Sequence, residues 1–178
     1  MYRELLLLGV LRHKQMHGYE LHEFINRDLA FCTDIKKPTA YHLLQKMAEQ
    51  GWITEIPETN APTNRPPRTV YQLTPMGEAK FLDYLRQNLA TYSPSYFNGD
   101  VGIAFIEALP PEESSNLLEQ RKTMLQTALN TLNHHPNDEV HSKGGMSLII
   151  EHQKRHLQAE IAWLDDVITL IRNQSHSK

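Results

Sequence analysis

Two arginines, Arg65 and Arg68, enclose a pair of prolines in the polar stretch Asn60–Arg68. Guanidinium groups bind phosphate oxygens, and on a proline-stiffened loop they can enter a minor groove at low entropic cost. Upstream lies Tyr41, near the start of a predicted helix, where its hydroxyl can bond a phosphate while its ring packs against the groove wall. We therefore predict contacts to duplex DNA. The alternatives are a solvated loop for the arginines and a core position against the preceding helix for Tyr41.

Other polar side chains around Tyr41 could share the same surface. Those expected to contact base edges are Thr39, His42 and Gln45. Those expected to contact phosphates are Lys36, Lys37 and Lys46. Exposed lysines often contribute nothing specific, which is the alternative for this group.

A scaffold must position these side chains, and the hydrophobic pattern predicts one. Apolar residues recur at helical spacing in three segments, Tyr2–His13, Tyr19–Leu29 and Thr39–Gln50, the last ending at Gly51. Lys14–Gly18 is expected to be a turn. The alternating runs Trp52–Ile56 and Thr69–Leu73 predict two strands on either side of the arginine loop. Thr74 and Pro75 begin a fourth helix that should reach Ala90. Three helices, a two-stranded wing and a trailing helix form a winged helix-turn-helix.

The second half of the chain is expected to be wholly helical. We place the domain boundary at Ser93–Asp100, which gives a DNA-binding domain over 1–92 and a helical domain over 93–178. Helices are predicted over Val101–Leu109, from Pro110 to about Asn133, and over Met146–Asn173. The last one carries a seven-residue repeat that suits packing of helix against helix. The repeat consists of Ile150, Leu157, Ile161, Leu164, Ile168 and Ile171.

Composition limits the possible classes of protein. With 178 residues and 40% hydrophobic side chains the chain can bury a core, and no apolar run approaches the about 20 residues of a membrane span. The single cysteine, Cys32, is compatible with a reducing compartment, so we expect a soluble cytoplasmic protein. The formal net charge is −3, and the acidic excess lies in the second half, so DNA affinity must depend on the placement of a few cations.

Catalytic and metal-binding signatures are sparse. The chain has no glycine-rich phosphate loop and no Gly-x-Ser-x-Gly motif, which argues against an enzyme and against a nucleotide cofactor. His152 and His156 have a spacing that can bind zinc, but no carboxylate or cysteine pattern completes a site, so we predict no metal.

The N-terminal residues resemble the PadR family of bacterial transcriptional regulators. The matching segments are, in order, His17–Leu21, Thr39–Leu44, Gly51–Ile53 and Arg65–Thr74, with Gly77. The resemblance covers about the first 90 residues; the C-terminal part is similar only in being helical and of suitable length. The chain departs from the family at Pro38-Thr39-Ala40 before the helix tyrosine, at His42 after it, and at an inserted proline in the wing tip. These departures put the operator sequence in question.

The resemblance implies a dimeric regulator, usually a repressor, that binds a two-fold-related operator and pairs through its C-terminal helices. It also implies release by a signal, in some members an aromatic small molecule, on which Trp163 could stack; interface packing is the alternative for Trp163. We therefore predict a homodimeric, sequence-specific DNA-binding regulator that recognises an inverted repeat. Two alternatives stay open: a winged-helix module that binds protein and reads no DNA, and a small-molecule-binding or catalytic protein.

Overall fold

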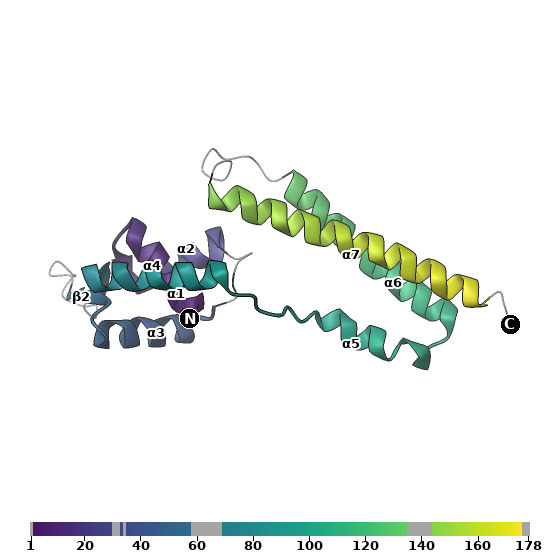
Figure 1. Ribbon diagram of the computed structural model, residues 1–178, viewed down its shortest axis with the longest axis horizontal. Helices are drawn as coiled ribbons and strands as arrows, with labels where there is room; N and C mark the ends of the chain where they lie inside the picture. The colour runs from purple at the N-terminus through teal and green to yellow at the C-terminus, as the bar shows by residue number, and fades with distance from the viewer. Residues whose placement is uncertain (1, 30–32, 34, 58–68, 135–143, 176–178) are drawn as a thin grey trace, which may run out of the picture. The chain divides into compact units, whose positions relative to one another are not determined.

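The computed structural model describes residues 2–29, 33, 35–57, 69–134 and 144–175 (Figure 1). The chain divides into two compact units, Met1–Pro94 and Ser95–Lys178. No helix in the described ranges is long and apolar enough to cross a membrane.

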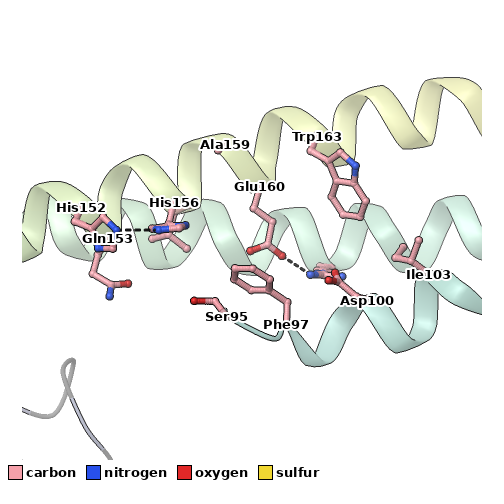
Figure 2. A pocket seen from close by; sticks show the side chains of 12 residues that line it. Ser95, Phe97, Asp100, Ile103, His152, Gln153, His156, Ala159, Glu160 and Trp163 are labelled. Atoms are coloured by element: carbon pink, nitrogen blue, oxygen red, sulfur yellow. Dashed lines mark hydrogen bonds and ion pairs between the residues drawn. The ribbon is translucent and has the colours of Figure 1, made fainter. Parts of the chain in front are cut away.

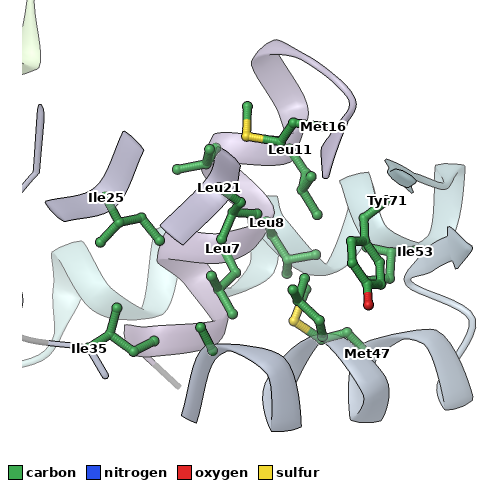
Figure 3. Close-up of a cluster of buried hydrophobic side chains, with 13 residues drawn as sticks. Leu7, Leu8, Leu11, Met16, Leu21, Ile25, Ile35, Met47, Ile53 and Tyr71 are labelled. Atoms are coloured by element: carbon green, nitrogen blue, oxygen red, sulfur yellow. The ribbon is translucent and has the colours of Figure 1, made fainter. Parts of the chain in front are cut away.

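In the described part of the N-terminal unit the helices are α1 (Tyr2–His13), α2 (Gly18–Asp28), α3 (Lys37–Glu49) and α4 (Pro75–Ala90). Helix α1 contacts α2, α3 and α4, which explains why its sequence is apolar almost all round. The core between these elements is shown in Figure 3. Its most deeply buried side chains are Leu7, Leu8, Leu21, Ile25, Leu44, Met47 and Ile53.

A three-stranded antiparallel sheet completes this unit, where the sequence predicted two strands. Strands β2 (Ile53–Pro57) and β3 (Thr69–Leu73) are the predicted pair, and β1 (Met16–His17) adds to the other edge of β3, in the order β1-β3-β2. The expectation that Lys14–Gly18 forms only a turn was therefore wrong. Two residues are too short to show an alternating pattern, and their strand conformation depends on pairing with distant partners such as Tyr71.

The junction between the wing and α4 is held by Thr74. Its hydroxyl oxygen accepts a hydrogen bond from the Gly77 amide at 3.0 Å, which caps α4 as predicted. The same oxygen lies 2.7 Å from the Gly51 carbonyl and 3.0 Å from the Trp52 carbonyl. Gly51, at φ +72°, ends the α3 segment in the left-handed conformation. The start of α4 is thereby fixed to the end of α3.

The C-terminal unit consists of α5 (Asn98–Ala104), a 3₁₀ turn η1 (Ile106–Ala108), α6 (Pro111–Asn133) and α7 (Gly145–Ser175). Helices α6 and α7 lie side by side (Figure 1). The helix expected over Val101–Leu109 instead starts at Asn98 and stops at Ala104. Asp100 in its first turn favours the earlier start, while the glycines in this stretch hid the helical pattern.

Candidate nucleic-acid interface and C-terminal pocket

Helix α3 has one buried face and one polar, exposed face. Ala40, Leu44 and Met47 have no exposed surface and pack into the core of the N-terminal unit. The exposed side chains of the helix include four of the predicted DNA contacts, and Lys36, its exposed N-cap residue, is a fifth. The four are Lys37, His42, Gln45 and Lys46. Only one acidic residue, Glu49, lies in the helix, at its C-terminal end.

The N-terminus of α3 concentrates positive charge. Pro38 lies in its first turn, where a fixed φ favours helix initiation, and the Ala40 amide donates to the Lys36 carbonyl at 3.0 Å. Lys36 and Lys37 thus lie at the helix end where unpaired backbone amides already favour anions. This end of α3 suits the binding of a phosphate group. Thr39, predicted to contact bases, is half-buried in the same turn.

Tyr41 lies between the core and the surface. Its ring packs on the first residue of α2, since a Cβ added at Gly18 would come within 2.8 Å of the Tyr41 Cε1 atom. The Lys37 Nζ atom lies 5.9 Å from the centroid of the same ring. Packing against the second helix is what the alternative for Tyr41 predicted, and the lysine contact places the ring at the edge of the cationic surface. Its contact with a phosphate stays a prediction.

Gln45 is held in one orientation by its neighbour along the helix. Its amide nitrogen donates to the Glu49 carboxylate at 3.2 Å, which leaves the Gln45 carbonyl oxygen available as an acceptor. Accepting groups in a major groove pair with the amino groups of adenine or cytosine.

The wing is described only in its strands. Arg65 and Arg68, the arginines predicted to enter a minor groove, lie outside the described residues, as does Cys32. Tyr71 on β3 is 8% exposed and lies opposite Glu55 in the sheet. Burial raises the pKa of the Tyr71 phenol, and the nearby Glu55 carboxylate adds to the rise.

The heptad residues of α7 do not share one environment. Leu164 and Ile168 are 0% and 2% exposed and pack within the chain, against residues that include Leu118 of α6 and Ile103 of α5. They therefore have almost no surface with which to contact a second chain, and any contribution to dimerisation would be indirect. The remaining heptad residues are partly buried: Ile150, Leu157, Ile161 and Ile171.

Large apolar side chains are exposed elsewhere in this unit, and the sequence pattern did not single them out. The most exposed of them in α5 to α7 are Val101, Phe105, Met124, Leu148 and Leu170. Large apolar side chains left exposed in a helical unit are candidates for contact with a partner.

A pocket of about 680 Å³ lies between α5, α6 and α7 (Figure 2). Trp163, suggested from the sequence as an effector contact, is part of its wall. His152 and His156 line it as well, with their Nε2 atoms 3.0 Å apart. Across the described ranges, no cluster of three His, Cys, Asp or Glu side chains could hold a metal ion.

Comparison with known proteins agrees with this geometry. Residues 7–83, which span α1 to α4, match the model of the transcriptional regulator PadR-like family. This N-terminal segment is therefore a module of the PadR-like family. Its members are transcriptional regulators and not enzymes, so the resemblance and the non-enzymatic class predicted from the sequence are confirmed.

Relatives of this PadR-like chain match it over nearly its whole length. The negative transcriptional regulator PadR of Bacillus subtilis is 21% identical over 174 residues, which cover 93% of this chain and 94% of that protein. The crystal structure of B. subtilis PadR in complex with operator DNA has a TM-score of 0.82 at 19% identity, covering 96% of this chain and 99% of the other. The same protein in complex with p-coumaric acid gives 0.77 at 20% identity, covering 95% and 98%. The Vibrio cholerae virulence activator AphA gives 0.71 at 18% identity, covering 97% and 99%. These likenesses show the fold of both units.

Proposed function

We propose that this PadR-like chain binds duplex DNA sequence-specifically and regulates transcription as a homodimeric repressor. The observation that carries the proposal is the exposed face of α3, where Lys36, Lys37 and Lys46 accompany His42 and Gln45. Lysines fix a protein on the phosphate backbone, while glutamine and histidine can read base edges. The fold that presents this face is also that of a B. subtilis protein crystallised with operator DNA.

In the proposed complex, α3 enters a major groove and the wing approaches the neighbouring minor groove. Thr39 and Tyr41 contact DNA beside the exposed face, and Arg65 and Arg68 act from the wing tip. A two-fold dimer places two such modules on half-sites about one helical turn apart, so the operator is an inverted repeat.

Dimerisation is proposed to use the C-terminal unit. Leu164 and Ile168 pack α7 onto α6 within one chain, so these two side chains need no partner chain to be buried. The partly buried heptad residues and the exposed apolar side chains, Val101 and Phe105 among them, then supply the contact surface. Such side chains are costly to leave in water and are suited to a permanent interface.

Repression and its release are the last part of the proposal. The B. subtilis relative is a negative regulator, and it has been crystallised with a small aromatic acid. The pocket between α5, α6 and α7 gives this chain a place for an effector, with Trp163 in its wall. Occupancy would change the geometry of the helices that pair the subunits and so shift the population away from the DNA-binding spacing.

The test is selection of bound duplexes from a random pool with purified protein at two salt concentrations. We expect an inverted repeat, bound by one dimer, with an affinity that falls as salt rises. The matched variant replaces Arg65 and Arg68 by alanine and should lower the affinity and flatten the salt dependence.

Recovery of no sequence above background at low salt would refute DNA recognition. It would favour a winged-helix module that binds protein, a reading supported by the weak net charge of residues 1–92.

A further inference from the structure

The pocket in the C-terminal unit has the size and shape of a small-molecule site. Its volume of about 680 Å³ lies within the range of pockets that enclose drug-sized ligands. Figure 2 shows Trp163 and Ile103 towards one end, His152 and Gln153 towards the other, and Phe97 between them. Two aromatic rings therefore line a single elongated space. Aromatic walls favour a flat, apolar ligand body.

Among the described residues that line the pocket, Arg121 is the one lysine or arginine, and its charge is already balanced by a carboxylate. Arg121 of α6 donates a hydrogen bond to the Glu160 carboxylate of α7, and both side chains are only about one quarter exposed, at 27% and 25%. The guanidinium group also lies against the backbone of Gly99. A ligand carboxylate that approaches Arg121 would have to share the guanidinium group with Glu160 and would be repelled by its negative charge.

Asp100 gives the pocket an excess of negative charge. It lies in the first turn of α5, it is exposed, and its carboxylate forms no ion pair or hydrogen bond with any residue that the structure describes. With the two histidines counted as uncharged, Asp100, Glu160 and Arg121 leave one net negative charge on the lining. A cation entering this space gains from Asp100 and from the faces of the aromatic rings.

We propose that the pocket binds a small organic cation with an aromatic body, such as an aromatic amine. The ring of the ligand lies against Trp163 or Phe97, and its ammonium group donates to Asp100. This inference rests on the proposed function, because it names the class of effector that the regulator would take. It also distinguishes this chain from its B. subtilis relative, whose crystallised ligand is an aromatic acid.

The experiment compares two probes of similar shape and opposite charge, tyramine and 4-hydroxyphenylacetate, by titration calorimetry on the full-length protein. We expect tyramine to bind at least about tenfold more tightly, the effect of one charge-assisted hydrogen bond. Asp100→Asn should weaken tyramine by about tenfold and leave the acid unchanged or slightly improved. The matched control is Asp166→Asn, which removes the same charge from an exposed site on α7 outside the pocket lining and should change neither constant.

A second variant, Trp163→Leu, should also weaken tyramine, because the indole face is lost while the wall stays apolar. Equal affinity for the two probes, tighter binding of the acid, no effect of Asp100→Asn, or no binding of tyramine at millimolar concentration would each overturn the proposal. The duplex selection without any amine is scored separately. If an operator is recovered and tyramine does not bind, the proposal of a cationic ligand is refuted and DNA recognition is not. If tyramine binds and no operator is recovered, DNA recognition is refuted and the ligand proposal is not.

Discussion

Replacing Gly77 by alanine should destabilise the DNA-binding unit, although alanine normally favours a helix over glycine. Gly77 lies in the first turn of α4, directly against the Trp52 carbonyl oxygen. A Cβ at this position would overlap that oxygen, which accepts hydrogen bonds from the Thr74 amide and the Thr74 hydroxyl at 3.0 Å each. The Trp52 carbonyl is part of the backbone and cannot rotate away as the end of a flexible side chain can. The first turn of α4 would therefore have to shift away from Trp52.

The magnitude follows from three contributions. Loss of the two hydrogen bonds to the Trp52 carbonyl costs about 1 kcal/mol each. Forcing a methyl group into packed surroundings costs about 1–3 kcal/mol more. The higher helix propensity of alanine offsets at most about 1 kcal/mol. The free energy of unfolding of the N-terminal unit should therefore fall by about 2–4 kcal/mol, and its urea midpoint by on the order of 1–2 M.

The two tryptophans allow each unit to be followed by itself. Trp52 lies in the N-terminal unit and Trp163 in the C-terminal unit, and the chain has no others. Urea unfolding of Gly77→Ala is measured by fluorescence in a Trp163→Phe background, so that Trp52 alone reports. The matched control is Gly102→Ala in α5, followed by Trp163 in a Trp52→Phe background. A Cβ at Gly102 meets nothing within 4 Å, so this change should be neutral or stabilise by up to about 1 kcal/mol.

The explanation for glycine at position 77 is tested by the signs of the changes in unfolding free energy caused by Gly77→Ala and Gly102→Ala. If Gly77→Ala were as stable as the parent, or more stable, the close approach of Trp52 would not be the reason for glycine at this position. A loss of equal size for Gly102→Ala would show that alanine disturbs these helices for some other cause.

Three further predictions concern the cationic surface, the C-terminal core and the wing. Replacing Lys36, Lys37 and Lys46 together by alanine should lower DNA affinity and reduce the slope of log K against log salt by up to about 3 per subunit; an unchanged slope in binding titrations would show that they contact no phosphates. Leu164→Ala should cost the C-terminal unit about 2–5 kcal/mol in urea unfolding because the side chain is fully buried, and a loss below 1 kcal/mol would contradict that packing. Because burial raises the pKa of Tyr71, the protonated phenol stabilises the fold below the unfolded-state pKa, and this stability should be lost as pH rises through the folded-state pKa. Tyr71→Phe should remove that component of the alkaline loss in unfolding experiments, and an identical pH profile for the variant would be evidence against it.

The helices and the wing strands could be predicted because their signals are local. Thr74 and Pro75 mark a helix start through capping chemistry, and Gly51 marks a stop through its left-handed backbone. Strand β1 had no such signal, because Met16–His17 becomes a strand only by pairing with β3. The start of α5 was misplaced because glycines weaken the helical pattern around Asp100.

The candidate sites also differ in whether their signal in the sequence is local or depends on contacts between distant segments. The polar face of α3 could be read from helical spacing, since buried and exposed residues alternate along one element. The pocket could not, because Asp100, Arg121 and Glu160 come from three helices that meet only in the folded unit. The heptad pattern of α7 placed Leu164 in an apolar stripe suited to packing against another helix, but a periodic stripe does not say whether that helix is α6 or belongs to another chain.

The pairing of β1 with β3 also has a consequence for protein synthesis. Met16 emerges from the ribosome 55 residues before its partner Tyr71. At about 5–20 residues per second this delay is on the order of seconds, far longer than the about microsecond needed to form a helix. Helices α1 to α3 are therefore available well before the sheet can close, and β1 has no strand partner until β3 has emerged, with α4 still to follow. A nascent chain arrested before residue 69 should carry helices but no sheet, which makes that stage the most exposed to proteolysis and misassociation.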